Sequence, residues 1–398
     1  MKNLEEFLSS KPLSYSEIDL TRMPKAFESV KNLAPQPRTI HIVGTNGKGT
    51  TGRFLASVLK ENGFSVLHYT SPHIFKLNER FWIDGDVISD EVLDQAHELI
   101  LITLSEELIK SVSYFEYTTL LIPAIIKIQN NIDFLILEAG LGGEFDATNV
   151  FKKELSIFTN MGIDHKHFLG NTITEIATTK LNSIHENSKA IISFQSFGED
   201  VYKIFRKIAS EKNSEYFLVK DLIENKERQE IGDYLKSQNI EQTFLNENFY
   251  TVVSALKVLN LEINFKVNNL ELLSGRMQKI AENIYLDVGH NLLASEKIKE
   301  FLLSKNIKNI TLIYNSLEDK EYHQILSELK EITSNVMIID LPTDNNRANA
   351  VRKETLQLTL DAIGIPFEDF SLEKINNQNI YLVFGSFRVA EEFLKIYN

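Results

Sequence analysis

The sequence predicts an α/β protein with two domains, the first built on a mostly parallel, P-loop-type sheet. Apolar runs of strand length alternate with stretches whose apolar residues recur at helical spacing, as expected when helices cover a parallel sheet. The apolar run 40–43 leads directly into a glycine-rich loop and then a helix. Because the alternation restarts near residue 273, we assign a larger domain to 1–272 and a second, smaller, Rossmann-like α/β domain to 273–398.

Composition narrows the classes of function. The formal charge of −13 argues against non-specific binding to nucleic acid or to an anionic membrane, because no basic block offsets it. The chain has no cysteine, which excludes disulfides, thiolate metal sites and thiol nucleophiles. No apolar run reaches the length of a membrane span. We therefore expect a cytoplasmic monomer that acts on small molecules.

The segment GTNGKGTT at 44–51, here called the phosphate loop, has the composition of a cradle for phosphate groups. Its three glycines allow positive φ angles and a close approach of backbone N–H groups to an anion. The helix expected at 48–62 points its positive end at the same place. Lys48 would supply a cation to the terminal phosphates, and Thr50 or Thr51 a hydroxyl near a bound Mg²⁺.

The phosphate loop departs from the strict P-loop pattern at two positions. That pattern has glycine at 42 and a hydroxyl residue directly after the lysine, whereas this chain has Ile42 and Gly49. A plain glycine-rich turn between a strand and a helix therefore stays open as an alternative on this motif alone.

The other elements of the first domain follow from proline positions, turn signals and periodicity. Residues 1–38 predict short helices that end at Pro35 and Pro37, since proline stops a helix. Asp84-Gly85 between apolar runs predicts a hairpin at 80–88. Helices are expected at 90–110, 114–131 and 247–259, strands at 64–69, 133–137, 155–160, 190–194 and 217–220, and a polar surface excursion at 224–239. In the second domain, strands are expected at 284–289, 310–315, 336–340 and 380–384.

An acidic residue, Glu138, directly follows the strand expected at 133–137. This strand is a nearly continuous apolar run, which is typical of a strand buried on both faces. An acid at the carboxyl end of such a strand, beside a phosphate loop, is where the metal of a nucleotide is usually held.

With these residues identified, the chain resembles the folylpolyglutamate synthase and dihydrofolate synthase family, part of the Mur-ligase superfamily of ATP-dependent amide-forming enzymes. Each motif is weak alone, but seven occur in register along almost the whole chain. They are GTNGKGT at 44–50, TSPH at 70–73, FEYT at 115–118, GLGGEFDATN at 140–149, GIDH at 162–165, GRMQ at 275–278 and LDVGHN at 286–291. The family's phosphate loop also has glycine after the lysine, which accounts for Gly49.

The resemblance implies an ATP-dependent acid–amino-acid ligase that forms ADP. It would add L-glutamate to dihydropteroate, forming dihydrofolate, and further glutamates to tetrahydrofolates, through an acyl phosphate. Asp19–Met23 and the form of the phosphate loop are similar to bifunctional bacterial members. Residues 1–272 would form the ATP-binding domain and 273–398 the glutamate-ligase domain.

Three alternatives remain. The chain could be a folylpolyglutamate synthase without the dihydropteroate reaction. A ligase for a cell-wall nucleotide precursor is disfavoured, because the roughly 38 residues before the first strand are too few for a precursor-binding domain. A nucleotide-binding protein without catalysis is disfavoured because it would need no second metal site.

The resemblance also implies two Mg²⁺ ions and names Lys48, Glu138, His165 and Lys180 as the catalytic candidates. Ser71 and Glu138 would hold the first ion, and His165 the second. Lys180 would be carbamylated by CO₂, so that its new carboxylate supports the second ion. Without the resemblance, His165 would be read as a structural histidine and Lys180 as an exposed helix lysine.

The remaining site residues are also implied by the resemblance. ATP would contact Gly44, Thr45, Asn46, Gly47, Lys48, Gly49, Thr50, Thr51, Asn248, Arg276 and Asp287. The folate substrate would contact Asp19, Arg22, Phe115, Glu116, Thr118, Gly142, Gly143 and Asp146. An aromatic ring can stack on the pterin and acids can pair with its amino groups, although core packing alone would also explain Phe115.

This sequence departs from the family pattern at two places beside these residues. Glu144 stands where the family commonly has arginine. The family usually shows Glu-Lys-Ala-Gly-Ile around the carbamylated lysine, whereas this chain has Thr179-Lys180-Leu181-Asn182-Ser183. An acid in place of a cation could change how an acidic substrate is held, and the sequence does not show what compensates.

Overall fold

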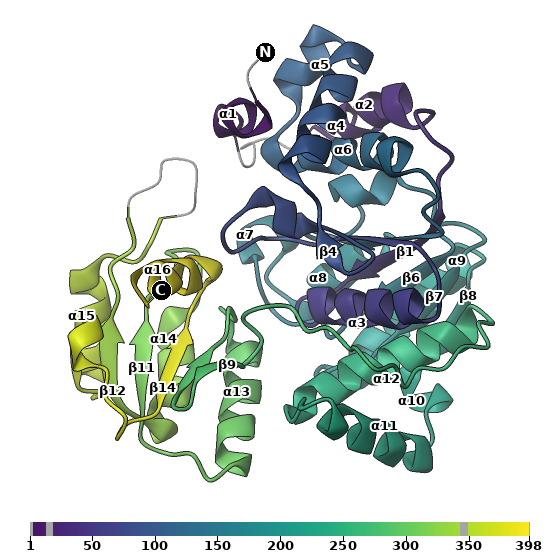
Figure 1. The fold of residues 1–398 in the computed structure, drawn as a ribbon. Helices are drawn as coiled ribbons and strands as arrows, with labels where there is room; N and C mark the ends of the chain where they lie inside the picture. Colours follow the sequence, from purple (N-terminus) through teal and green to yellow (C-terminus); the bar gives the residue numbers. More distant parts are fainter. Residues whose placement is uncertain (1–2, 13–18, 343–348, 398) are drawn as a thin grey trace. The chain divides into compact units, whose positions relative to one another are not determined.

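The computed structural model describes residues 3–12, 19–342 and 349–397, which divide into two compact units (Figure 1). Unit 1 comprises Met1–Glu241 and Leu245–Glu271, and unit 2 comprises Gln242–Phe244 and Leu272–Asn398. Of the region 1–38, where short helices were expected, residues 1–2 and 13–18 lie outside the described part, and the rest contains the helices α1 Leu4–Ser9 and α2 Arg22–Val30. Among the described residues, we find no helix with the length and apolar character needed to span a membrane.

Unit 1 contains an eight-stranded sheet in the order β4-β3-β2-β5-β1-β6-β7-β8. Six of these strands pair in parallel, whereas β3 pairs antiparallel with both β2 and the edge strand β4; Asp84-Gly85, both with positive φ, joins β3 to β4. The strands are β1 Arg38–Val43, β2 Val66–Tyr69, β3 Phe81–Ile83, β4 Asp86–Val87, β5 Phe134–Glu138, β6 Leu155–Phe158, β7 Lys189–Ile192 and β8 Glu215–Leu218. Central strand β1 pairs Ile42 with Glu138 of β5 and Val43 with Phe158 of β6, so these three strands end at one edge.

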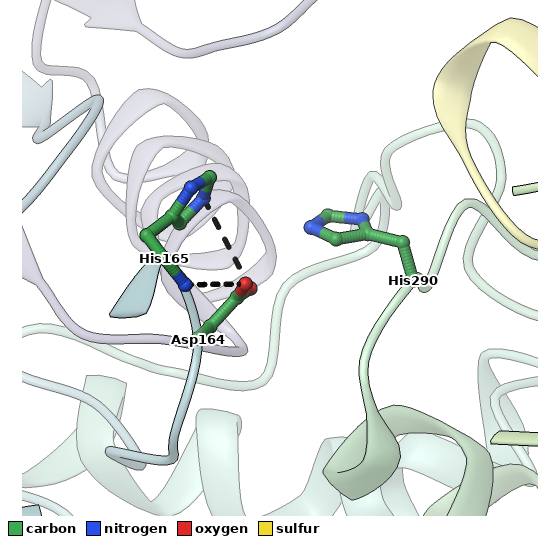
Figure 2. Close-up of side chains that lie close together, drawn as sticks. All are labelled: Asp164, His165 and His290. Atoms are coloured by element: carbon green, nitrogen blue, oxygen red, sulfur yellow. Dashed lines mark hydrogen bonds and ion pairs between the residues drawn. The ribbon is translucent and has the colours of Figure 1, made fainter. Parts of the chain in front are cut away.

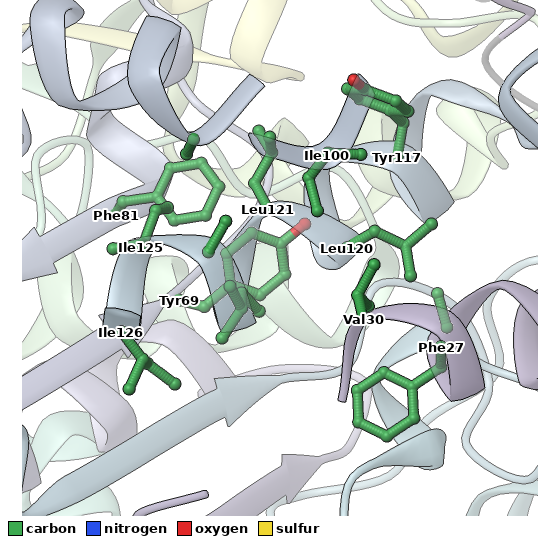
Figure 3. Close-up of a cluster of buried hydrophobic side chains, with 14 of the residues drawn as sticks. Phe27, Val30, Tyr69, Phe81, Ile100, Tyr117, Leu120, Leu121, Ile125 and Ile126 are labelled. Carbon is green, nitrogen blue, oxygen red and sulfur yellow. The ribbon is translucent and has the colours of Figure 1, made fainter. Parts of the chain in front are cut away.

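Helices cover both faces of this sheet, with α4 and α6 on one side and α3 and α12 on the other (Figure 1). Figure 3 shows the core under α6, where Leu120 and Leu121 pack with Tyr69 and Phe81 of the strands. The helices are α1 Leu4–Ser9, α2 Arg22–Val30, α3 Lys48–Glu61, α4 Asp90–Thr103, α5 Glu106–Ser111, α6 Tyr114–Gln129, α7 Lys166–Leu169, α8 Ile173–Leu181, α9 Gly198–Glu211, α10 Val219–Leu222, α11 Asn225–Ser237 and α12 Thr243–Val258, with 3₁₀ turns η1 Leu77–Arg80 and η2 Ala147–Val150.

Two expectations for unit 1 are wrong in detail. The helix expected at 90–110 is two helices, because Leu104 is extended and Ser105 accepts a hydrogen bond from Leu108 N, which starts α5. The polar stretch 224–239 is not a surface excursion but helix α11, which buries Ile231 and Leu235. These residues are four apart, so the helical signal was present among the charges.

Unit 2 contains a six-stranded sheet in the order β13-β12-β11-β14-β10-β9, parallel except for β9. Its strands are β9 Gln278–Ala281, β10 Ile284–Leu286, β11 Ile310–Tyr314, β12 Thr333–Ile338, β13 Phe367–Asp369 and β14 Tyr381–Phe384. Its helices are α13 Leu292–Ser304, α14 Tyr322–Leu329, α15 Lys353–Ile363 and α16 Phe387–Tyr397, with 3₁₀ turns η3 Lys330–Ile332 and η4 Leu372–Lys374. The four expected strands are present, whereas the two edge strands, β9 and β13, were not predicted from the sequence.

Candidate active site

The phosphate loop lies between the end of β1 at Val43 and the start of α3 at Lys48. Of its three glycines, Gly47 has the positive φ, +86°, and a side chain there would meet Asn248 Oδ1 at 2.4 Å from the Cβ. A Cβ at Gly44 would lie 1.9 Å from Thr159 Oγ1. Gly44 is therefore needed for its close approach to the residue after β6, and Gly47 for its backbone conformation.

The backbone N–H groups of the phosphate loop divide into two sets. Thr45 N and Asn46 N donate to Asn160 O at 3.0 and 3.2 Å, which ties the loop to the end of β6. The N–H groups at the first turn of a helix have no intrahelical acceptor, and at α3 they follow Gly47. This geometry favours the start of α3, rather than residues 45 and 46, as the place for an anion.

Two lysine side chains converge on one carbonyl of the phosphate loop. Lys48 Nζ donates to Gly44 O at 3.2 Å and to Thr45 O at 3.2 Å, and Lys180 Nζ donates to Gly44 O at 2.9 Å. Lys48 thus places a cation at the phosphate loop, where a polyphosphate would need it. Thr50 and Thr51 lie in the first turn of α3 and are buried, and Thr51 Oγ1 has no hydrogen-bond partner among the described residues.

Lys180 lies near the end of α8 and is buried, so it is not an exposed helix lysine. Burial, with a smaller effect of the Lys48 charge, lowers the pKa of Lys180 to about 7, against the opposing charges of Asp164 and Asp146. Near neutral pH a substantial fraction of this amine is therefore uncharged.

Glu138, at the end of β5, is buried and receives two hydrogen bonds from the segment after β2. Ser71 N donates to Glu138 Oε2 at 3.1 Å, and Thr70 Oγ1 donates to the same oxygen. Ser71 and Glu138 therefore lie side by side, as the sequence analysis expected, and the oxygen ligands they offer are of the kind that Mg²⁺ prefers. Thr70 was not predicted as a site residue, although it belongs to the TSPH motif.

His165 precedes α7 with a left-handed backbone, φ +51°, and its neighbour Asp164 holds it in place (Figure 2). His165 N donates to Asp164 Oδ1 at 2.8 Å, and Nε2 lies 4.0 Å from Asp164 Oδ2. Asp164 was missed as a site residue, although it stands in the GIDH motif. His290, also drawn in Figure 2, belongs to unit 2, where its Nδ1 lies 3.1 Å from Val288 O.

The segment 140–149, here called the glycine loop, is shaped by Asp146. This buried carboxylate accepts hydrogen bonds from Leu141 N at 2.8 Å and from Thr148 N and Oγ1 at 2.9 and 2.5 Å. Burial raises the pKa of Asp146, and these hydrogen bonds oppose the rise. Gly142 has a φ of +74°, and a Cβ at Gly143 would lie 2.5 Å from Lys180 O. The three residues thus shape the loop and set its contact with Lys180.

The predicted folate contacts divide into two groups. In the first group, Arg22 Nε donates to both carboxylate oxygens of Glu116 at 3.1 and 3.0 Å. Phe115 packs on the glycine loop so closely that a Cβ added at Gly140 would lie 2.6 Å from Phe115 Cζ. These residues start α2 and α6 and lie beside the glycine loop. Thr118 is instead buried in the core, where its hydroxyl donates to Phe115 O at 3.0 Å and lies 2.9 Å from Tyr69 Oη.

Asp19 is exposed and lies at the turn before α2, where the charge and the backbone N–H of Arg22 act on its carboxylate. Its Oδ1 accepts hydrogen bonds from Thr21 N and Thr21 Oγ1, both at 2.8 Å, just before α2 begins. The Thr21 hydrogen bonds lower the pKa of Asp19. In this structure, its side chain organises the turn that leads into α2.

The predicted nucleotide contacts of unit 2 lie together. Asp287 accepts hydrogen bonds from Met277 N at 2.8 Å and Gly289 N at 2.7 Å, one on each oxygen. Burial raises the pKa of Asp287, and the Arg276 charge is the first effect that opposes it. Arg276 Nη1 donates to Gly275 O at 3.1 Å. Asp287 therefore holds together the segments before β9 and after β10.

Unit 2 also contains a cavity of about 430 Å³ that the sequence analysis did not foresee. Three cationic side chains, Arg352, Lys353 and Arg388, line it together with Glu318 and Asp340. These residues follow β11 and β12 or begin α15 and α16, so they come from separate stretches of the chain. The cavity can accept a small molecule that carries both signs of charge.

The comparisons with known proteins agree, because the similar proteins described below all carry a folylpolyglutamate synthase or synthetase description. No model of a protein family matches the chain. The solved folylpolyglutamate synthetase of Helicobacter pylori is 34% identical, with 99% of this chain and 97% of that chain covered and a TM-score of 0.76. The dihydrofolate synthase/folylpolyglutamate synthase of Haemophilus influenzae is 29% identical over 413 aligned residues, covering 95% of this chain and 93% of that protein. A bifunctional enzyme of the same description, solved with Mn, AMPPNP and L-glutamate bound, shares the fold at 22% identity, with a TM-score of 0.79 and 97% and 98% of the two chains covered.

Proposed function

The chain belongs to the dihydrofolate synthase/folylpolyglutamate synthase family, whose members are ATP-dependent ligases, and we propose that it adds L-glutamate to dihydropteroate and further glutamates to tetrahydrofolates. The observation that carries this proposal is the position of Lys48, whose Nζ lies on Gly44 O of the phosphate loop together with that of Lys180, directly after the strand that pairs with the one ending in Glu138. A carboxylate and the γ-phosphate of ATP repel each other, so a ligase must gather cations where they meet.

The residues of unit 1 have distinct roles in this proposal. Lys48 and the N–H groups at the start of α3 orient the phosphates, and Asn248, against Gly47, borders the same place. Ser71 and Glu138 would hold one Mg²⁺, and His165, supported by Asp164, a second. Bound Mg²⁺ supplies charge neutralisation for the phosphates. The substrate carboxylate then attacks the γ-phosphorus, ADP leaves, and the amino group of glutamate displaces phosphate from the acyl phosphate to form the amide.

Carbamylation of Lys180 is part of the proposal. An uncharged amine is needed to attack CO₂, and the lowered pKa of Lys180 provides one near neutral pH. The attack forms a C–N bond, releases a proton and leaves a carboxylate. That carboxylate would support the second ion, so that metal binding and carbamylation stabilise each other.

The cavity of unit 2 is the proposed place for L-glutamate, and unit 2 would thus be the glutamate-ligase domain. Glutamate has two carboxylates and one ammonium group. The cavity offers Arg352, Lys353 and Arg388 to the carboxylates, and Glu318 and Asp340 to the ammonium. Lys353 also pairs with Asp369 at 2.6 Å, which holds its amine at the start of α15. Arg276 and Asp287 remain predicted nucleotide contacts of this unit.

The folate side of the proposal rests on α2 and α6. Phe115 against the glycine loop offers a ring face to a pterin, and the Arg22–Glu116 pair offers hydrogen-bonding groups beside it. The contacts predicted for Asp19 and Thr118 have no such support, because Asp19 caps its own turn and the Thr118 hydroxyl is engaged in the core. The cytoplasmic location and the monomeric state also remain predictions.

One experiment separates the proposed reactions. Purified protein is incubated with ATP, Mg²⁺, L-glutamate and either dihydropteroate or tetrahydrofolate, and phosphate release and product mass are measured. We expect both substrates to give phosphate and a product heavier by one glutamyl residue. Product from tetrahydrofolate alone would reduce the protein to a folylpolyglutamate synthase. Nucleotide binding without phosphate release or product would contradict the proposed function.

A further inference from the structure

The carboxylate of Glu144 is hydrogen-bonded to the residue that ends α8. Glu144 Oε2 accepts a hydrogen bond from Asn182 Nδ2 at 2.9 Å. Lys212 Nζ donates to the backbone oxygens of Asn182 and, at 2.7 Å, Ile184. Burial lowers the pKa of Lys212, and the charge of Glu144 is the first effect that opposes it. The negative charge of Glu144 is therefore compensated by Lys212, which is bound to the turn that follows α8.

The backbone around Glu144 is tied to the same turn. Glu144 N donates to Thr179 O at 3.0 Å, and Gly143 is in such close contact with Lys180 that no side chain fits between them. Asn149 Nδ2 in turn donates to Glu144 O at 2.7 Å. The glycine loop thus contacts the chain at Thr179, Lys180 and Asn182, on both sides of the lysine that reaches the phosphate loop.

Lys153 makes a second link between the same two segments. Its buried amine donates to Asn149 Oδ1 and, at 2.9 Å, to Ser183 O. This link does not use the Glu144 carboxylate, so the two segments stay connected when that carboxylate is removed. The Glu144–Asn182 hydrogen bond additionally fixes the position of Asn182 relative to the glycine loop. Asn182 ends α8, where the last carbonyl groups have no intrahelical donor.

The geometry points to Glu144 and Asn182 as positioning residues, which hold the end of α8 so that Lys180 Nζ stays on Gly44 O. Lys180 carries its amine on a flexible side chain, so its reach depends on where its backbone is fixed. In this arrangement the Glu144 carboxylate does not contact an acidic substrate and does not neutralise the cationic groups of the site. The catalytic readout of this inference rests on the proposed function.

Exchanging the donor and the acceptor of the bond tests the inference. Glu144→Ala removes the acceptor, and Asn182→Asp sets two carboxylates against each other. Glu144→Gln keeps a carbonyl that accepts from Asn182. In the double variant Glu144→Gln/Asn182→Asp the amide donates to the new carboxylate, so the bond forms again with its direction reversed.

In steady-state ligation with dihydropteroate, we expect Glu144→Ala and Asn182→Asp to lose kcat by about 10–100-fold, as for a misplacement of the order of 1 Å, with little change in KM. Glu144→Gln and the double variant should keep or recover most of the wild-type kcat. Glu186→Ala is the matched control, because Glu186 is an exposed acid whose charge also acts on Lys212. Its kcat should equal that of the wild type.

Two kinetic results would overturn the inference. A higher KM for the folate substrate in Glu144→Ala, with unchanged kcat, would make Glu144 a substrate contact. A double variant as slow as Asn182→Asp would show that the hydrogen bond is not what matters. Circular dichroism of each variant establishes that it is folded.

Amide hydrogen exchange provides a readout that does not need activity. Residues 140–149 and 178–184 should exchange faster in Glu144→Ala than in the wild type, and return to wild-type rates in the double variant. Unchanged exchange in Glu144→Ala would overturn the inference even in an active enzyme. Absence of ligation by the wild type would contradict the proposed function and leave this exchange test intact.

Discussion

Lys180 is the residue whose chemistry depends most on its surroundings. Its amine is buried, donates to a backbone carbonyl and lies near Lys48, Asp164 and Asp146. Burial favours the uncharged amine, which is the form that reacts with CO₂. The family resemblance identified Lys180, although the residues that flank it differ from the family pattern. The burial of Lys180 could not be predicted, because α8 packs against strands that are distant in the sequence.

A pH-dependent stability follows from the lowered pKa of Lys180. In the unfolded chain the lysine holds its proton up to about its ordinary pKa of 10.5, whereas in the folded protein it loses the proton above about 7. Between these values the unfolded state binds more protons, so the free energy of unfolding should rise with pH by up to about 1.4 kcal/mol per pH unit. Urea unfolding of the wild type and Lys180→Met in CO₂-free, metal-free buffer at pH 7, 8 and 9 measures the difference. A difference that stays constant with pH would show that Lys180 keeps its ordinary pKa.

Chemical rescue tests the carbamate of Lys180. Lys180→Ala should lose most of its ligation rate, and formate or acetate should restore part of it by placing a carboxylate in the vacated space. Lys180→Arg should gain nothing from either anion, because its fixed positive charge fills the space. Near-normal turnover of Lys180→Ala would contradict a catalytic role, and an inactive variant that no carboxylate helps would contradict the carbamate. Initial rates across a range of formate concentrations measure both outcomes.

At the scale of elements, the phosphate loop depends on the contact of Gly44 with Thr159. A methyl group at Gly44 would lie 1.9 Å from Thr159 Oγ1, so Gly44→Ala should destabilise the protein by about 1–3 kcal/mol, as for overpacking. Thr159→Ala removes the clashing oxygen, and the double variant should recover part of the loss in urea unfolding. Gly232→Ala in α11 is the control, because its methyl group would meet no atom closer than 3.8 Å. A Gly44→Ala variant as stable as the wild type would contradict the close contact.

The sequence was informative where a local signal decides the structure. Asp84-Gly85 defined the hairpin, and the apolar run before Glu138 defined a strand buried in the sheet. Local signals did not suffice for short edge strands such as β13, of three residues, whose pairing partner β12 lies about 30 residues earlier in the chain. The break at Leu104 depended on the cap that Ser105 supplies.

Among the site residues, sequence motifs indicated which side chains form the site but not all of the contacts that these side chains make. The family resemblance assigned Ser71 and Glu138 to one ion and Asn248 to the nucleotide, and the structure places Ser71 next to Glu138 and Asn248 next to Gly47. The motifs did not reveal that Asp146 holds its own loop, since this depends on hydrogen bonds that only the folded loop forms. The same limit applies to the cavity of unit 2, whose lining residues have no motif that the sequence analysis identified.

At the scale of the whole molecule, the chain leaves unit 1 at Glu271, and this residue is firmly held. Glu271 Oε2 accepts from Arg53 Nη1 at 3.3 Å and from Trp82 Nε1 at 2.9 Å. Burial lowers the pKa of Arg53 to about 10, against the charge of Glu271. Because Arg53 belongs to α3, the last residue of unit 1 is attached to the helix that begins at the phosphate loop.

Removing this acid leaves a buried guanidinium without its charged partner. Glu271→Ala should lower the free energy of unfolding by about 3 kcal/mol, as for one half of a buried ion pair. Trp82 is the one tryptophan of the chain, so its fluorescence reports the loss of the hydrogen bond and follows unfolding in urea. Glu262→Ala, at an exposed acid of the same segment, should change neither signal. A stable Glu271→Ala variant with unchanged fluorescence would contradict the attachment.

In the proposed reaction ATP activates the carboxylate of the folate substrate before glutamate attacks it, and transfer of oxygen to phosphate tests this order of steps. Dihydropteroate labelled with ¹⁸O in both carboxylate oxygens is incubated with ATP, Mg²⁺, L-glutamate and the enzyme. We expect one ¹⁸O per turnover in the released phosphate and one in the amide of dihydrofolate, both measured by mass spectrometry. Dihydrofolate formed with no ¹⁸O in the phosphate would contradict an acyl phosphate intermediate.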